Sequence, residues 1–325
     1  MPRRFLVRSL RLVGLLVFVA CSREPPVVRI FVANQADDSV SVIDGALDRE
    51  VQIIPVGRAP QAIALRTAAP PLVAISNNGA STVTLIDPVG LAVAGDPVKV
   101  GRRPEGVAFS PDGTLLFAAS PTDHSVAVID VATRMPRRDP IPFAKEPLRV
   151  VAMPDGHLLV LIHDKDGEAA LVEPATGSLL AKASVGPFPS DAVVTRDGRR
   201  ILVASFDAQT LTVLDAATLA QLDRYSIEIG YGLVLHPSKP LLYSMRSFEG
   251  EIGVVDIDAR RDVGTITVGA WPNYSAITPD GRNLYVVNND ANNVVRVDTE
   301  SRQTVVRIAV GSEPVGAVVW VGGRG

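Results

Sequence analysis

Short stretches in which apolar residues alternate with small or polar ones recur about every 42 residues along the chain, and each ends in an acidic residue. The seven stretches are SVSVID (39–44), TVTLID (82–87), SVAVID (125–130), AALVE (169–173), TLTVLD (210–215), EIGVVD (251–256) and NVVRVD (293–298). Alternation with a period of two is typical of a half-buried β-strand. A strand that returns at a fixed spacing indicates a repeat protein, in which each unit buries its apolar faces against its neighbours.

The unit at 102–145 shows the contents of one repeat. It contains four predicted strands: EGVAFS (105–110), LLFAAS (115–120), SVAVID (125–130) and a weaker one near PIPFA (140–144). PDG (111–113) has the Pro and Gly placement of a type I turn between the first two strands. Asp130 is expected to accept hydrogen bonds from backbone amides of the turn that follows it. Four antiparallel strands per unit form the blade of a β-propeller.

The two ends of the chain determine the number of blades. VVRIFVAN (27–34) matches the second strand of a unit, and PVGAVVW (314–320) matches the innermost strand that the first unit lacks. The start of every innermost strand is marked in the same phase by a proline, with Gly230 at the one missing position: Pro60, Pro104, Pro147, Pro189, Pro272 and Pro314. The sequence therefore predicts an all-β fold at 27–325, a seven-bladed β-propeller of four-stranded antiparallel blades. The C-terminal strand is expected to close the ring by completing the first blade.

The start of the chain has a different pattern. Four arginines precede an apolar stretch that is too short to span a bilayer as a mature helix, which predicts a signal peptide at 1–20. FVAC (18–21) resembles the lipobox of bacterial lipoproteins, in which Cys21 would carry the lipid. Residues 21–26 would then be a tether, and the protein would lie in the periplasm, anchored by its lipid to the outer membrane. The alternative is an ordinary secretory peptide that is cleaved near Ala20.

The composition of the chain excludes several classes of partner and cofactor. The net charge is −3 and basic residues are balanced by acidic ones throughout, so nucleic acid is not an expected partner. Cys21 is the only cysteine, which excludes an internal disulfide and a multi-cysteine metal site. No CxxCH motif is present for the usual covalent attachment of c-type haem. We therefore expect a monomer with no cofactor of its own, whose contact with a membrane is through the lipid anchor alone.

A binding site is expected on one face of the propeller, where the loops that lead into the innermost strands, called the inner loops, meet the loops between second and third strands. The candidate ligand-binding residues on the inner loops are Arg58, Arg102, Arg103, Arg149, Tyr231, Trp271 and Tyr274. In one interpretation the arginines hold an anionic group and Trp271 and Tyr274 stack on a planar or apolar part of the ligand. In the other, the arginines are solvated and the aromatic residues plug the channel.

Catalytic and metal motifs are scarce. The four histidines lie in different units, and only His124 and His163 are on neighbouring loops, so no metal site is expected. No GxSxG motif supports a serine hydrolase. Asp123, Glu105 and Asp191 are carboxylates on the candidate face, and no sequence feature distinguishes one of them as a general base.

The segment 284–314, LYVVNNDANNVVRVDTESRQTVVRIAVGSEP, resembles the YVTN-type β-propeller repeat family. YVVN (285–288) is close to the motif that names the family, and FVAN (31–34) is a second near match. The resemblance extends over the whole chain after the tether. It implies a propeller similar to those of surface layers and periplasmic proteins, and more distantly to propeller lactonases, but a shared fold does not transfer an activity.

Three functional hypotheses follow. The first is a noncatalytic envelope lipoprotein whose propeller is a scaffold that binds an envelope protein or a small anionic ligand. The second is a hydrolase resembling the propeller lactonases, with its general base at the channel mouth. The third is a periplasmic accessory to a redox enzyme, which would act by docking because the chain offers no cofactor ligands.

Overall fold

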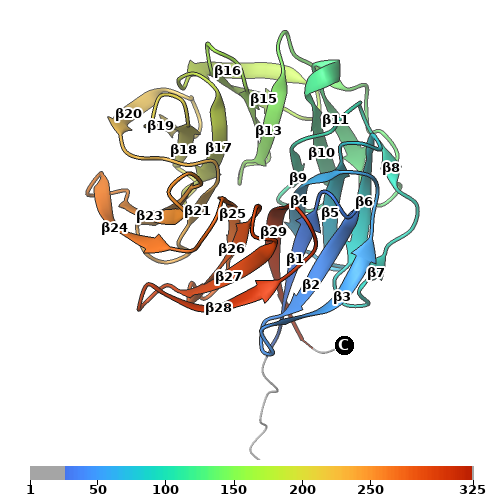
Figure 1. Ribbon diagram of the computed structural model, residues 1–325. Helices are drawn as coiled ribbons and strands as arrows, with labels where there is room; N and C mark the ends of the chain where they lie inside the picture. Colours follow the sequence, from blue (N-terminus) through green and yellow to red (C-terminus); the bar gives the residue numbers. More distant parts are fainter. Residues whose placement is uncertain (1–25, 324–325) are drawn as a thin grey trace, which may run out of the picture.

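The computed structural model describes residues 26–323, which form seven antiparallel sheets arranged in a ring (Figure 1). The innermost strand of each sheet faces the common axis. The predicted seven-bladed propeller is therefore confirmed. None of the described residues belongs to a helix that is long and apolar enough to cross a membrane. The predicted signal peptide at 1–20 and the predicted lipidation site Cys21 lie outside the described residues.

Six blades have four strands, and the second blade has its outermost strand split in two. From the inside outward, the first three blades are β29 (Pro314–Gly322), β1 (Val27–Asn34), β2 (Ser39–Asp44) and β3 (Arg49–Pro55); β4 (Pro60–Arg66), β5 (Leu72–Asn77), β6 (Thr82–Asp87), β7 (Ala92–Val93) and β8 (Val98–Lys99); and β9 (Val107–Phe109), β10 (Leu115–Ser120), β11 (Ser125–Asp130) and β12 (Ile141–Pro142). The next two are β13 (Pro147–Ala152), β14 (Leu158–Ile162), β15 (Glu168–Glu173) and β16 (Ser178–Ser184); and β17 (Pro189–Val194), β18 (Arg200–Ser205), β19 (Thr210–Asp215) and β20 (Gln221–Ser226). The last two are β21 (Leu233–Leu235), β22 (Leu241–Arg246), β23 (Glu251–Asp256) and β24 (Arg261–Thr267); and β25 (Pro272–Ile277), β26 (Asn283–Asn288), β27 (Asn293–Asp298) and β28 (Gln303–Ala309). A 3-10 helix, η1 (Pro121–Asp123), joins β10 to β11.

Strand β29 closes the ring, as the sequence predicts. It pairs antiparallel with β1 in a register that sets Val27 opposite Gly322 and Arg29 opposite Trp320. The Trp320 residue is only 6% exposed, because its ring packs with Phe31 in the cluster between the first and second blades. The first blade is therefore built from both ends of the described chain.

Seven buried apolar clusters hold the blades together, and each lies between two neighbouring blades. On β10, Leu116 packs toward the second blade, whereas the next residue, Phe117, packs with Leu158 and Val160 of the fourth blade. Successive side chains of a strand point to opposite faces, so one apolar strand serves two interfaces. This explains why middle strands such as β10 and β14 are apolar on both faces.

The recurring acidic residue ends the third strand of each blade and closes a turn. In the third blade, the backbone amide and hydroxyl of Thr133 both donate to Asp130 Oδ1 at 2.9 Å, and these bonds hold the pKa of Asp130 below its usual value. Equivalent turns form at Asp215 and Asp298. Because the strands are antiparallel, these turns lie on the face opposite the inner loops. We call the face with the inner loops the upper face and the face with the acidic turns the lower face.

Inner loops pass very close to a side chain of the blade that they enter. A glycine three residues before the recurring proline sits directly over the last residue of a second strand. A Cβ added to Gly57 would lie 2.6 Å from Cγ of Asn77, and one added to Gly311 would lie 2.6 Å from Cγ of Asn34. No side chain fits at that distance, so glycine lets each loop lie against the blade before it turns inward.

The outermost strands are the least regular part of the fold. The predicted fourth strand near 140–144 is shortened to β12, which contains Pro142 and follows Pro140, and proline has no N–H to donate to a neighbouring strand.

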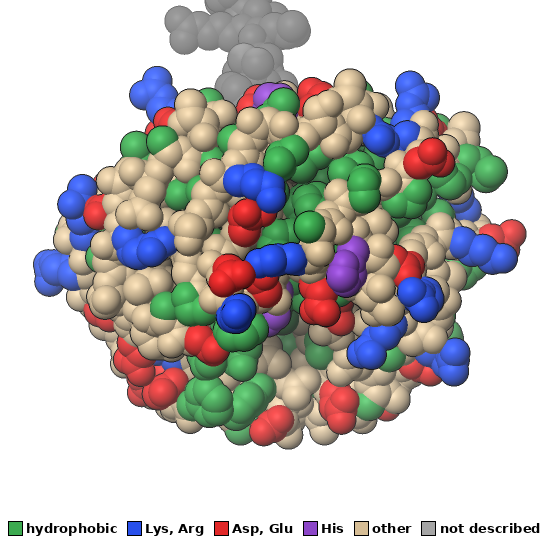
Figure 2. Space-filling view, turned by 90° about the horizontal axis from the view of Figure 1, so that it is seen from above, with side chains coloured by type: hydrophobic (Ala, Val, Ile, Leu, Met, Phe, Trp, Pro, Cys, Tyr) green, Lys and Arg blue, Asp and Glu red, His purple; other side chains and the backbone are tan. Residues whose placement is uncertain are grey.

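On the side of the molecule shown in Figure 2, basic and acidic side chains are intermixed rather than gathered by sign. The surface seen there shows no basic stripe.

Candidate functional site

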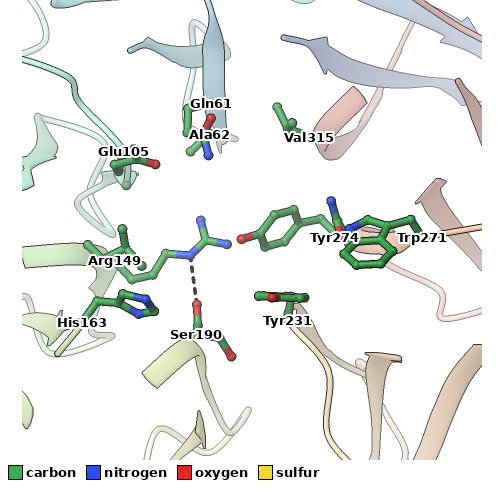
Figure 3. A pocket seen from close by; sticks show the side chains of 13 residues that line it. Gln61, Ala62, Glu105, Arg149, His163, Ser190, Tyr231, Trp271, Tyr274 and Val315 are labelled. Atoms are coloured by element: carbon green, nitrogen blue, oxygen red, sulfur yellow. Dashed lines mark hydrogen bonds between the residues drawn. The ribbon is translucent and has the colours of Figure 1, made fainter. Parts of the chain in front are cut away.

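A cavity of about 290 Å³ opens at the upper face around the axis of the ring. Its walls include side chains from all seven blades, among them Gln61, Glu105, Arg149, Ser190, Tyr231, Tyr274 and Val315 (Figure 3). We call it the axial cavity. Its volume is at the small end of the range for ligand sites, which suits a small molecule.

A bulge in the innermost strands turns three side chains toward the axis: Arg149 and Tyr274, which line the axial cavity, and Asp191, which lies beside Arg149. The pairing register shifts between Pro147 and Arg149 in β13, and strands β17 and β25 shift in the same way just before Asp191 and Tyr274. A β-bulge inserts one residue on one side of a strand pair and changes the direction of a side chain. The second residue after the recurring proline is therefore the position that points toward the channel.

Arg149 is the centre of the axial cavity, and only 19% of its side chain is exposed. Its Cζ lies 4.5 Å from the centroid of the Tyr274 ring, and its Nε lies 3.7 Å from Asp191 Oδ1 and donates a long hydrogen bond of 3.5 Å to the Ser190 carbonyl. Burial opposes its charge, but Tyr274, Asp191 and Glu105 together raise the pKa of Arg149. Within residues 26–323 neither of its two Nη atoms makes a hydrogen bond, so both are free to donate to a ligand.

Two carboxyl groups accompany this guanidinium. Asp191 accepts hydrogen bonds of 3.0 Å from the backbone amides of Leu233 and Ala192, which fix its position, and burial raises its pKa. Glu105 accepts one hydrogen bond of 2.9 Å from Asn78, and burial raises the pKa of Glu105 more than the nearby arginines lower it. Both acids are therefore easier to protonate than exposed carboxylates.

Aromatic side chains line one side of the upper face. The rings of Phe206 and Tyr231 are stacked with centroids 4.4 Å apart and planes at 17°. Phe248 follows, with its centroid 5.9 Å from Phe206, and meets the Trp271 ring edge-on at 4.8 Å. Phe248 is 64% exposed. These four residues, Phe206, Tyr231, Phe248 and Trp271, form a continuous aromatic wall whose two ends, Tyr231 and Trp271, line the axial cavity, while Phe248 is exposed to solvent.

Four of the seven predicted ligand-binding residues come together in the axial cavity: Arg149, Tyr231, Trp271 and Tyr274. The other three do not line it. Arg58 donates to the Gly79 carbonyl, Arg102 pairs with Asp123 at 2.6 Å, and both are exposed, as is Arg103. These three precede the recurring proline, where the loop is still at the rim, whereas Arg149 follows it and is turned inward by the bulge. Of the four arginines that one interpretation places around an anion, only Arg149 lines the axial cavity.

Two members of the aromatic wall, Phe206 and Phe248, are not among the residues that the sequence analysis singles out. Phe206 directly follows strand β18, at the position that Asn78 and Asn289 occupy after β5 and β26. An aromatic residue at a position where other blades carry asparagine is the signal that could have identified it. His163 also lines the cavity, while His124 does not, and no group of three or more potential metal ligands occurs among the described residues.

No protein-family model and no curated protein sequence matches this chain. Solved structures do share its fold. The hydrazine synthase of Kuenenia stuttgartiensis matches with a TM-score of 0.75 at 20% identity, over 83% of this chain and 92% of that one. The dihydro-heme d1 dehydrogenase NirN, solved in complex with DHE, matches with a TM-score of 0.67 at 16% identity, over 89% of this chain and 74% of that one. At these identities the likeness concerns the fold.

Proposed function

We propose that this protein is a noncatalytic binding module of the cell envelope whose axial cavity takes up a small ligand with an anionic group and a flat apolar part. The observation that carries this proposal is the largely buried Arg149, which has two free Nη atoms, lies against the ring of Tyr274 and shares its cavity with Tyr231 and Trp271. A guanidinium in a partly dehydrated site forms strong hydrogen bonds with an anion. The rings of Tyr231 and Trp271 offer the apolar surface against which a flat group stacks.

A role as an accessory to a redox enzyme is the second candidate. It is supported by the fold neighbours, because a hydrazine synthase and a dihydro-heme d1 dehydrogenase are both redox enzymes by name. The aromatic wall, with Phe248 exposed, would then be the surface that contacts the enzyme. A lactonase-like hydrolase has less support: burial raises the pKa values of Glu105 and Asp191, and these two carboxyls are what favours it.

Benzenesulfonate tests the binding proposal, because it has a flat ring and stays ionised across the pH range in which proteins are stable. We expect calorimetric titration to show that it binds more tightly than the uncharged benzenesulfonamide. We also expect its affinity to fall by roughly tenfold as the pH rises through the raised pKa of Glu105. Below that pKa the Glu105 carboxyl is neutral, and above it the carboxylate repels the ligand and competes for Arg149.

A Glu105→Gln variant is the control for this pH effect, since it keeps the size and polarity of the side chain but cannot ionise. It should bind benzenesulfonate with little dependence on pH. Equal affinity of the wild-type protein for the sulfonate and the sulfonamide at every pH would refute the proposal, because a site built around Arg149 must prefer the anion.

The envelope location is part of the same proposal and rests on the sequence pattern around Cys21. We expect the full-length chain to sediment with the outer membrane of a bacterial host and a Cys21→Ser variant to do so no longer, because serine cannot accept the lipid by thioether linkage. Immunoblots of membrane and soluble fractions make the comparison. Equal distribution of the two proteins would favour the alternative of an ordinary secretory peptide.

A further inference from the structure

A second cavity of about 220 Å³ adjoins the axial cavity on the upper face. It is lined by His163, Phe188, Ser190, Phe206, Asp207 and Tyr231. Three of these residues, His163, Ser190 and Tyr231, also line the axial cavity, so the two spaces share one wall and open beside each other. We call the second one the side cavity.

The side cavity has an aromatic lining and one carboxylate. Phe188, Phe206 and Tyr231 are each half-buried, so part of each ring faces the cavity rather than protein. Phe206 and Tyr231 stack on each other, and Phe188 meets the ring of His163 at 5.4 Å. These ring contacts hold the aromatic side chains in place before any ligand arrives.

Asp207 is the only fixed charge in the lining of this cavity. It is exposed, and in the described part of the chain no lysine or arginine lies within ion-pair distance of it and no group donates a hydrogen bond to its carboxylate. Most other carboxylates on the upper face have partners: Asp123 pairs with Arg102, Asp164 with Lys145, and Asp191 with Arg149. The side cavity therefore combines three aromatic rings with an unpaired negative charge.

This combination suits a cation. The faces of aromatic rings carry negative charge density and attract ammonium groups, and most strongly those that are alkylated and shed water easily. The adjoining axial cavity has the opposite character, because Arg149 offers two free donors to an anion. Positive and negative subsites thus lie next to each other on either side of Tyr231.

We propose that the two cavities together bind a small zwitterion, with an alkylated ammonium group in the side cavity and a carboxylate at Arg149. The anionic half of this proposal rests on the proposed function, and the cationic half rests on Phe188, Phe206, Tyr231 and Asp207 alone. Tyr231 is shared by both subsites, so its ring packs against the chain that joins the two charges.

Two carboxylic acids of the same shape, one with a positive charge and one without, test the cationic half of the proposal separately from the anionic half. 4-(Trimethylammonio)butanoate carries a quaternary nitrogen, and 5,5-dimethylhexanoate has a neutral carbon in its place. We expect calorimetry on the mature protein to give about tenfold tighter binding of the charged compound, from cation–π contact and from Asp207. Asp207→Asn and Phe206→Leu should each reduce this preference to about threefold or less. Glu249→Gln, which removes an exposed carboxylate from the corresponding loop of the next blade, is the matched control and should leave the preference intact.

Each outcome decides the proposal. Equal affinity for the two acids would overturn it and leave the binding proposal for Arg149 standing, since both acids would still bind. A preference that persists in both Asp207→Asn and Phe206→Leu would also overturn it, because the cation would then be recognised elsewhere. If neither acid binds, the proposed anion site at Arg149 is refuted, and choline then tests the cation subsite alone. Choline binding that Asp207→Asn weakens would support the side cavity as a cation site, and no choline binding would reject it. Asp207 is exposed, so that variant is expected to fold even if Phe206→Leu does not.

Discussion

A chain that ends at Ser312, and so lacks β29, is expected to be unfolded rather than to form a slightly smaller propeller. The truncation removes the innermost strand of the first blade and exposes the edge of β1 along the whole paired register from Val27 to Asn34. It also removes Trp320 and Val319 from the two clusters on either side of that blade. Loss of a buried Trp side chain alone costs about 3–5 kcal/mol, which is comparable with a large part of the stability of a typical domain.

Circular dichroism during thermal denaturation measures this effect. A chain that ends at Gly323 is the control, because it keeps all of β29 and should melt like the full-length protein. Trp320→Ala should be intermediate: folded, but less stable by about 3–5 kcal/mol. A cooperative transition near the wild-type temperature in the chain that ends at Ser312 would show that six blades and an open edge suffice.

Arg149→Met is expected to reduce the affinity for benzenesulfonate by roughly ten- to a hundredfold, since hydrogen bonds to a charged group are worth about 1.5–3 kcal/mol. Methionine keeps the length of the side chain and removes its charge and its donors. Arg102→Ala is the matched control, because Arg102 lies on an inner loop of the same face, is exposed and does not line the cavity. It should bind the sulfonate as the wild-type protein does.

The same substitution leaves Asp191 without its charged partner, so a loss of binding must be distinguished from a loss of structure. We expect Arg149→Met to lower the free energy of unfolding by about 1–3 kcal/mol, less than for a fully buried pair because both side chains retain some exposure. Adding Asp191→Asn should recover part of that stability and none of the binding. Unchanged sulfonate affinity in the folded Arg149→Met variant would place the anion site elsewhere.

The fold could be predicted because its signals repeat. The acidic residue at the end of a third strand and the proline before an innermost strand each occupy one position in the blade, so their phases define strand order, loop positions and ring closure. Each blade contacts only its neighbours, and one well-defined unit therefore determines the rest. The outermost strands were predicted less accurately, because prolines at 140 and 142 interrupt the strand pairing that the apolar composition indicates.

The site could be predicted only in part, because its residues do not repeat. Arg149, Tyr231, Trp271 and Tyr274 were identified from their loops, but the arginines of other loops could not be told apart from Arg149 without the bulge that follows the proline. The stacking of Phe206 on Tyr231 joins loops of two different blades, and its geometry depends on the angle between those blades. Sequence spacing contains no measure of that angle.

Strands β1 and β29 have a practical consequence for experiments on this protein. Val27 and Gly322 are paired neighbours, and both lie at the lower-face ends of their strands. A linker to a biosensor surface joined directly to Val27 or to Gly322 therefore leaves from the side away from the axial and side cavities. An immobilised propeller would present its cavities to the flowing solution, and the lipid anchor proposed above, joined to the chain on the Val27 side, would hold them facing away from the membrane.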